Sequence, residues 1–218
     1  WFRKGSWEGS WTTGEVPGGE VLGKILGLVG YGTIGREVAS RARALGMPIK
    51  VVSAHPPKRK PRDVDFWKGP AALPQLLKES DYVVLACPLN KKTQGLIGPR
   101  EFKQMKRHAF LINVARGAVV QEEALYRALK DRRIAGAAID VWYRYPKDNE
   151  RCRPSRFPFH ELDNVVMTPH VSGWTLETRQ KRFQLVADNI SRLVAGKPLL
   201  NVVQGPRKHS QAEWNQPR

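Results

Sequence analysis

The stretch Ile25-Leu26-Gly27-Leu28-Val29-Gly30-Tyr31-Gly32-Thr33-Ile34-Gly35 decides the fold of this chain. Its first five residues form a short apolar run, which is typical of a buried strand. Apolar residues then recur at helical spacing up to a terminating Gly46: Ile34, Val38, Ala42 and Leu45. Three glycines in the pattern GxGxxG stand between the predicted strand and the predicted helix. In this context the pattern predicts a dinucleotide-binding turn.

Each glycine of this turn has a physical task. Gly30 permits the tight turn, Gly32 lets a pyrophosphate approach the backbone, and Gly35 lets the helix pack closely on the strand. Thr33 and Ile34 open the helix, whose first N–H groups are free to bind phosphate. We therefore expect these five residues to bind a dinucleotide. The alternative is a glycine-rich turn without a ligand.

Further apolar runs alternate with helical periods along the chain. The predicted strands cover 49–52, 82–86, 109–113, 136–141 and 165–167, and the predicted helices lie near 76–77, at 122–130 and at 175–195. Strands that are apolar throughout and alternate with helices predict a parallel sheet covered on both faces, the doubly wound α/β or Rossmann fold. Residues 142–163 form a long loop with several prolines, and loops of that length are usually functional.

The end of the second strand bears on the cofactor. An NAD site usually places an acidic residue there, about 20 residues after the glycines. His55 occupies this position, and Lys58, Arg59, Lys60 and Arg62 follow it. A missing carboxylate and added cations suit a 2′-phosphate, so the cofactor is NAD or NADP, with NADP slightly favoured. The alternative is a solvated basic loop beside a bound NAD.

Composition narrows the classes of partner. The 218 residues include 37 Lys and Arg against 20 Asp and Glu, a net charge of +17. The basic residues are dispersed, with no nucleic-acid motif and no interleaved aromatic residues on which bases could stack, so nucleic acid is disfavoured as a partner.

The longest apolar run, 82–87, is too short for a membrane span, which needs about 20 residues. No His and Cys spacing fits zinc, so no metal is expected. Two cysteines without a disulfide framework fit a reducing, cytoplasmic setting.

Three further stretches follow the glycine turn along the chain: Asn113-Val114-Ala115-Arg116-Gly117, Ala138-Ile139-Asp140-Val141-Trp142 and Thr168-Pro169-His170-Val171-Ser172-Gly173. With the GxGxxG turn, they resemble the motifs of the D-isomer-specific 2-hydroxyacid dehydrogenases, and the resemblance runs from about residue 3 to residue 203. It implies an oxidoreductase that transfers a hydride between NAD(P)H and a small 2-keto or 2-hydroxy acid related to glyoxylate, hydroxypyruvate or glycerate. It also implies a homodimer formed through the cofactor domain.

The resemblance also implies a domain organisation. The family inserts its Rossmann domain into a flavodoxin-like substrate domain, to which a C-terminal helix returns. On this basis residues 1–20 are a lead-in or hinge, 21–174 the dinucleotide-binding domain, 175–203 the return helix and 204–218 a frayed tail. The family's N-terminal substrate domain has no counterpart here and residue 1 is Trp, so we expect an incomplete enzyme. The alternative is a non-catalytic NAD(P)-sensing scaffold, because some relatives with this fold act as corepressors.

The same resemblance assigns the catalytic residues. Arg116 would hold the substrate carboxylate with its fork of donors, and His170 would act as the acid or base. The family pairs this histidine with a Glu, whereas this chain has Tyr145 at that position. Three interpretations are open: Tyr145 orients His170, Asp148 or Glu150 substitutes for the Glu, or the site is catalytically degraded. The first is favoured.

Three more residues stand at strand ends within this pattern. Cys87 and Pro88 follow the third predicted strand, near the expected nicotinamide position, so they are candidates for the cofactor site. The other interpretation of Cys87 is a small buried hydrophobe. Asp140 ends the fifth predicted strand and is expected to be structural or cofactor-adjacent rather than catalytic.

Overall fold

The computed structural model of the chain describes residues 19–148 and 151–202. Most of the predicted lead-in and all of the predicted tail therefore lie outside the described residues, as does Glu150. The chain divides into two compact units, 1–172 and 173–218. No helix in the described part of the chain is long and apolar enough to cross a membrane.

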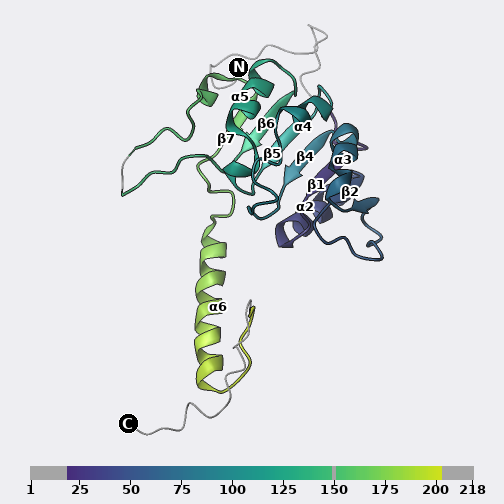
Figure 1. Cartoon of the computed structure of the whole chain (residues 1–218). Helices are drawn as coiled ribbons and strands as arrows, with labels where there is room; N and C mark the ends of the chain where they lie inside the picture. Colours follow the sequence, from purple (N-terminus) through teal and green to yellow (C-terminus); the bar gives the residue numbers. More distant parts are fainter. Residues whose placement is uncertain (1–18, 149–150, 203–218) are drawn as a thin grey trace, which may run out of the picture. The chain divides into compact units, whose positions relative to one another are not determined.

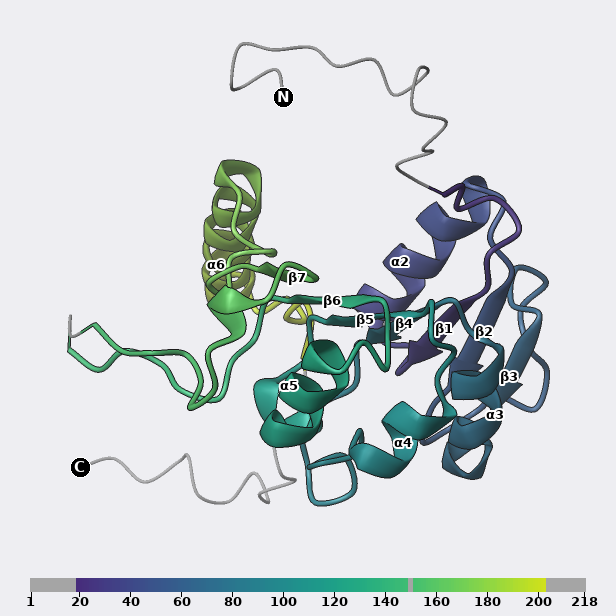
Figure 2. The ribbon, with the colours of Figure 1, turned by 90° about the horizontal axis from the view of Figure 1, so that it is seen from above.

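The first unit is built on one parallel sheet, which has seven strands in the described part of the chain (Figures 1 and 2). The strand order is β3-β2-β1-β4-β5-β6-β7. In chain order the strands are β1 (Leu26–Val29), β2 (Ile49–Val52), β3 (Phe66–Lys68), β4 (Tyr82–Leu85), β5 (Phe110–Asn113), β6 (Gly136–Ile139) and β7 (Val165–Met167). Because β1 pairs with both β2 and β4, the winding reverses beside β1, where such sheets bind ligands. The predicted doubly wound fold is confirmed.

Helices cover both faces of this sheet. They are α2 (Thr33–Ala44), α3 (Leu73–Glu79), α4 (Pro99–Gln104) and α5 (Glu122–Lys130). Short 3-10 helices span Pro70–Ala72, Gly117–Val119 and Phe159–Glu161. Figure 2 shows α2 on one face, with α3, α4 and α5 on the other.

Each face has its own apolar core. On the α2 face the core includes Leu28, Ile49 and Val51 of the strands and Ala39 and Ala42 of the helix. The core on the other face is larger and includes Leu76, Leu77, Phe102, Leu111, Leu125 and Leu129. These burials explain why the strands are apolar throughout: a parallel sheet covered on both faces leaves few strand positions open to water.

Three details of the sequence prediction were wrong. Strand β3 was missed because it is a partly buried edge strand of three residues, too short for a periodic signal. Helix α4 was missed because its six residues are too few for a periodic apolar signal, although Pro99 at its start is typical of a helix N-terminus. Of the apolar series predicted for α2, Ile34 and the C-cap residue Leu45 are exposed, whereas Ala42 is buried together with Gly35 and Ala39. Small residues on this face let the helix lie close to the sheet.

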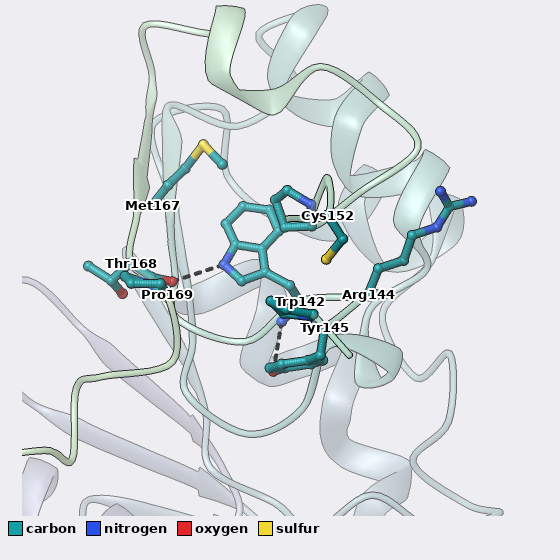
Figure 3. Close-up of a pocket in the computed structure, with 9 residues that line it drawn as sticks. Trp142, Arg144, Tyr145, Cys152, Met167, Thr168 and Pro169 are labelled. Atoms are coloured by element: carbon teal, nitrogen blue, oxygen red, sulfur yellow. Dashed lines mark hydrogen bonds between the residues drawn. The ribbon is translucent and has the colours of Figure 1, made fainter. Parts of the chain in front are cut away.

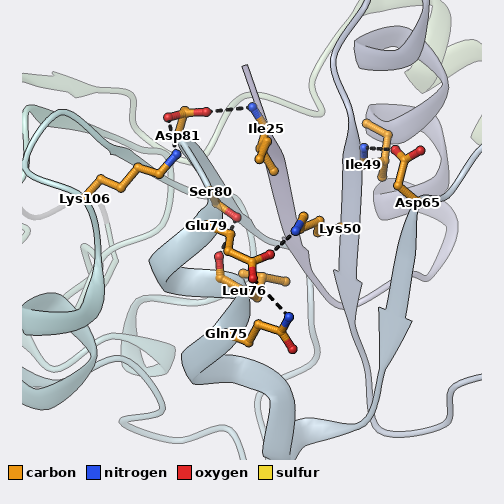
Figure 4. A network of polar contacts seen from close by, with 10 residues as sticks. All are labelled: Ile25, Ile49, Lys50, Asp65, Gln75, Leu76, Glu79, Ser80, Asp81 and Lys106. Carbon is orange, nitrogen blue, oxygen red and sulfur yellow. Dashed lines mark hydrogen bonds and ion pairs between the residues drawn. The ribbon is translucent and has the colours of Figure 1, made fainter. Parts of the chain in front are cut away.

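Two carboxylates, the buried Asp81 and the exposed Asp65, bind backbone N–H groups at the amino ends of the strands (Figure 4). Asp81 accepts hydrogen bonds from the Ile25 N–H at 2.8 Å and from Lys106 at 2.7 Å. Asp65 accepts one from the Ile49 N–H at 2.7 Å. These bonds satisfy N–H groups at the start of β1 and β2, and they lie at the opposite edge of the sheet from the glycine turn.

The second unit is built around α6 (Leu176–Val194). Thr175 caps its N-terminus, because its side-chain oxygen accepts from the Thr178 N–H at 3.0 Å. After the helix, Asn189 bonds both backbone groups of Leu200, which ties the following segment back to the helix. The predicted apolar stripe of this helix is exposed: Phe183, Val186, Ile190, Leu193 and Val194.

Candidate active site

The glycine turn has the geometry that its sequence demands. Gly30 has a φ of +97°, and a Cβ there would lie 2.7 Å from the Ala86 oxygen. A Cβ on Gly35 would lie 2.5 Å from the Gly30 oxygen. A Cβ on Gly32 would meet nothing within 4 Å. The turn therefore needs glycine at Gly30 and Gly35 for packing, while Gly32 borders open space.

The start of α2 is suited to an anion. Gly32 is the N-cap residue, and no side chain caps the first N–H groups of this helix. Its first turn contains no acidic residue. Unpaired N–H groups at a helix N-terminus carry partial positive charge and bind phosphate. The backbone of Thr33, Ile34 and Gly35 is therefore available to a pyrophosphate, and the residues present fit a dinucleotide.

A groove of about 500 Å³ opens beside this turn, at the carboxyl ends of β1, β4 and β5. It is lined by Gly32, Thr33, Ile34, Ala86, Cys87, Pro88, Leu89, Val114, Ala115 and Arg116. It thus brings five of the predicted cofactor residues, Gly32, Thr33, Ile34, Cys87 and Pro88, together with the predicted substrate-binding arginine. Cys87 is both a groove residue and buried, and burial raises the pKa of its thiol, so the thiol stays neutral.

The predicted 2′-phosphate residues lie elsewhere along the same edge. His55, Lys58 and Arg59 are exposed in the loop after β2 and are not part of the groove lining. Lys60 is used locally, because its ammonium group donates to the Val64 oxygen at 2.7 Å. Cofactor binding by His55, Lys58 and Arg59 stays a prediction.

The loop that carries Arg116 is held by its neighbours. The side chain of the buried Asn113 accepts from the Ala115 N–H and donates to the Arg116 oxygen, both at 3.1 Å. A Cβ on Gly117 would lie 2.3 Å from the Trp142 oxygen, so this position must lack a side chain. Arg116 itself is exposed. The motif that contains Asn113 and Gly117 did not predict a role for either residue, although a polar residue at the end of a buried strand is a recognisable signal.

His170 and Tyr145 meet after β7 and β6. The Tyr145 hydroxyl lies 3.1 Å from His170 Nδ1, and it accepts a hydrogen bond from the Trp142 N–H at 3.2 Å. Figure 3 shows the bond between Trp142 and Tyr145. The phenol oxygen therefore lies within hydrogen-bond distance of the imidazole, and which of the two groups donates depends on the tautomer of His170. Of the three interpretations, the one that places Tyr145 beside His170 matches this geometry.

Asp140 organises the segment that carries His170. This buried carboxylate accepts from Thr168 Oγ1 at 2.6 Å, from the Val171 N–H at 2.9 Å, and from Ser172 through its N–H at 3.2 Å and its Oγ at 2.6 Å. Burial alone would raise the pKa of Asp140, but hydrogen bonds from Ser172, Thr168 and the Val171 N–H outweigh it and hold the pKa below its usual value. Both oxygens are engaged, and a contact of Asp140 with the cofactor stays a prediction.

The long loop after β6 borders a second pocket, of about 330 Å³ (Figure 3). Its lining is mainly apolar: Trp142, Arg144, Tyr145, Pro146, Cys152, Pro154, Met167, Thr168 and Pro169. Backbone bonds from Tyr143 and Arg144 to the Pro154 oxygen close the loop on itself. Glu122 of α5 anchors the far side by accepting from Ser155 and Arg156. The loop that carries Tyr145 is therefore held by hydrogen bonds within itself and to α5.

Residues 1–172, which include the glycine turn, Arg116, Tyr145 and His170, match the model of one protein family, described as D-isomer specific 2-hydroxyacid dehydrogenase, NAD binding domain. The chain belongs to this family. The family resemblance predicted from the motifs is confirmed, and so is the prediction of NAD or NADP as the cofactor.

Similar proteins agree with this membership. A glyoxylate reductase of Thermococcus gammatolerans is 43% identical over 191 residues, which are 87% of this chain and 53% of the archaeal protein. The chain thus spans about half the length of that reductase.

Solved structures of the family share the fold. An NADPH-dependent glyoxylate/hydroxypyruvate reductase from Sinorhizobium meliloti, in complex with NADP and sulfate, is 26% identical with a TM-score of 0.74, over 93% of this chain and 60% of the reductase. A D-lactate dehydrogenase with NAD⁺ from Lactobacillus jensenii is 27% identical with a TM-score of 0.73, over 94% of this chain and 62% of the dehydrogenase. Because the two hold different dinucleotides, the likeness does not choose between NAD and NADP.

Proposed function

We propose that this 2-hydroxyacid dehydrogenase chain carries the hydride-transfer site of an NAD(P)H-dependent reductase of small 2-keto acids. The substrate class is that of glyoxylate and hydroxypyruvate, with glycerate-like acids as the reduced products. One observation carries the proposal: a single groove joins the open N-terminus of α2 to Arg116. A dinucleotide and a carboxylate substrate need these two anion sites side by side.

Each residue of the site has a task in this reaction. A bound nicotinamide would supply the hydride. Arg116 pairs with the substrate carboxylate and polarises the adjacent carbonyl, because a guanidinium fork matches a carboxylate in geometry and charge. Cys87 and Pro88 contribute an uncharged part of the groove lining.

His170 handles the proton. In its doubly protonated form it would give the Nε2 proton to the substrate oxygen and return to neutral imidazole. Tyr145 holds Nδ1 and so directs Nε2 away from itself. The products are a hydroxyl group and the oxidised dinucleotide, and solvent restores the proton on His170.

The loop after β2 favours NADP within this proposal. Lys58 and Arg59 are exposed at the carboxyl edge of the sheet, and the expected acidic residue is replaced by His55. Cations there would bind a 2′-phosphate, whereas a carboxylate would repel it. The same proposal includes a homodimer, which the family resemblance implies. It also includes a cytoplasmic location, because Cys87 and Cys152 are free thiols.

A non-catalytic NAD(P)-sensing scaffold is the competing proposal. The observation in its favour is that a neutral phenol replaces the family's carboxylate beside His170. A scaffold needs the groove and the glycine turn but has no use for proton transfer. The two proposals therefore differ in turnover, while they agree on cofactor binding.

The test measures both quantities on the longest natural polypeptide that contains this sequence. NADPH binding is followed by fluorescence, and turnover by NADPH oxidation with glyoxylate or hydroxypyruvate. We expect His170→Ala to abolish turnover but keep NADPH affinity, while the control His160→Ala, another exposed histidine of the first unit, keeps both. Arg116→Lys should raise KM for the keto acid about 10- to 100-fold, since it loses a charge-assisted hydrogen bond of ~1.5–3 kcal/mol. NADPH binding without turnover in the native protein would favour the scaffold instead.

A further inference from the structure

The pocket between the long loop after β6 and the end of β7 has no task in the function proposed above. It has a volume of about 330 Å³, and in the described part of the chain none of its lining residues also lines the groove beside the glycine turn. Pockets of at least this size, with a mainly apolar lining and a few polar groups, are typical of small-molecule sites. The pocket is therefore a candidate ligand site separate from the groove.

The inner part of the pocket is apolar. Figure 3 shows the Trp142 indole between Met167 and Cys152, all three of which line the pocket. The polar groups of this wall are already engaged: the indole N–H donates to the Thr168 oxygen at 2.9 Å, and Thr168 Oγ1 donates to Asp140 at 2.6 Å. An indole and a thioether both pack favourably against an aromatic ring. The inner part therefore suits an apolar group, above all an aromatic one.

The rim of the pocket is positively charged. Arg144 lines the pocket and is exposed, and its side chain extends away from Trp142 (Figure 3). No Asp or Glu lines the pocket within residues 19–148 and 151–202. The loop sequence from 144 to 153 contains four basic and two acidic residues. An anionic group at the rim is therefore attracted, whereas a cationic one is repelled.

The loop that forms one wall of the pocket is held in place before any ligand binds. The backbone N–H groups of Tyr143 and Arg144 donate to the Pro154 oxygen at 3.2 and 3.1 Å. Glu122 of α5 accepts from Ser155 Oγ at 2.9 Å. A wall that is already ordered lowers the entropic cost of binding.

We propose that this pocket binds a small organic carboxylate that carries an aromatic or branched apolar group. The apolar group packs against Trp142 and Met167, and the carboxylate lies at the rim near Arg144. The proposal concerns binding at a second site and does not depend on turnover at the groove. Tyr145 also lines the pocket, and its hydroxyl lies 3.1 Å from His170, so the ligand contacts a neighbour of the predicted acid or base.

The test uses 3-phenylpropionate, which has the proposed chemistry and no keto group to reduce. Methyl NMR of the longest natural polypeptide that contains this sequence, labelled with 13C-methyl methionine, reports on the pocket. Met167 lines the pocket, whereas Met47 and Met105 are buried in the two cores. The Met167 signal is assigned by its loss in Met167→Leu. We expect a saturable shift of this signal, with the Met47 and Met105 signals unchanged.

Three variants of exposed residues test the two halves of the ligand. Arg144→Gln should weaken 3-phenylpropionate about two- to fivefold, the range of an exposed ion pair, and leave the affinity for the neutral 3-phenylpropanamide unaltered. The control Arg153→Gln removes a nearby exposed charge that is not part of the lining and should leave both affinities unaltered. Cys152→Trp places a large side chain in the pocket and should remove the saturable shift.

The outcomes separate this proposal from the proposed reaction. Absence of a saturable Met167 shift overturns the site, and so does a shift that disappears in Arg116→Gln, because the probe then binds at the groove. Equal effects of Arg144→Gln and Arg153→Gln on 3-phenylpropionate overturn the position of the carboxylate. A saturable Met167 shift in a protein without any turnover of glyoxylate supports the pocket and contradicts the proposed reaction.

Discussion

Replacing Tyr145 by Glu restores a carboxylate beside His170 and tests how this chain manages its proton. The Tyr145 hydroxyl lies 3.1 Å from Nδ1; the shorter Glu side chain would place its carboxylate farther back, within about 4–6 Å of the imidazole, where an opposite charge still acts on its pKa. An opposite charge this close raises the pKa of an imidazole by about 1–3 units. Tyr145 is 47% exposed, and solvent screening weakens exposed pairs, so we expect the lower end of that range.

The direction follows from the form of His170 that each reaction needs. Reduction needs the doubly protonated imidazole, and a carboxylate partner lets that form persist to higher pH. The alkaline limb of the reductive pH profile should therefore move up by about one pH unit in Tyr145→Glu, which corresponds to ~1.4 kcal/mol. At pH values above the alkaline limbs of both proteins, Tyr145→Glu should reduce the keto acid about tenfold faster than the native protein. The reason is that each pH unit changes the protonated fraction of the histidine about tenfold.

The assay is the initial rate of NADPH oxidation with glyoxylate across the pH range, at saturating cofactor. Tyr145→Phe is the matched control: it keeps the ring but removes the hydroxyl, so kcat should fall without an upward move of the limb. If Tyr145→Glu and the native protein share the same alkaline limb while both turn over, the phenol is not the partner of the catalytic histidine.

Three further predictions concern the glycine turn, the cofactor and acid stability. Gly30→Ala should lower the free energy of urea unfolding by at least ~1–2 kcal/mol, because its φ is left-handed and a Cβ would clash with the Ala86 oxygen. Gly32→Ala should leave that free energy nearly unchanged but weaken NADPH binding, so equal losses of stability in the two variants would contradict the assigned roles. Lys58→Ala and Arg59→Ala should raise the Kd for NADPH and leave that for NADH unaltered; a parallel rise in both would remove the 2′-phosphate argument. Burial alone would raise the pKa of Asp81, but hydrogen bonds from Lys106, the Ile25 N–H and His108 outweigh it and hold the pKa below its usual value. The ionised Asp81 therefore stabilises the fold at pH values above its unfolded pKa of about 3.9. This stabilisation is lost as the pH falls through the lower pKa that Asp81 has in the folded protein. Asp81→Asn should therefore flatten the loss of stability in that acid range, and an unaltered slope would contradict this reasoning.

Local signals in the sequence account for much of the architecture. The strands of a sheet covered on both faces must be apolar throughout, and that requirement is visible as short runs whatever the rest of the chain does. The requirement for glycine at Gly30 and Gly35 is equally local, because the turn between β1 and α2 involves residues close in sequence. The edge strand β3 left no such trace, since three half-buried residues at a sheet edge need no periodic pattern.

The sequence by itself determined the parallel fold, the dinucleotide turn and, through motifs, the positions of Arg116 and His170. Only the tertiary structure decided which side chain meets His170 and what holds it there. Tyr145 and His170 are separated by 25 residues and follow different strands. The partners of Asp140 lie 28 to 32 residues away. Such contacts arise because β6 and β7 pair in parallel and end at the same edge, a three-dimensional fact that no local spacing encodes.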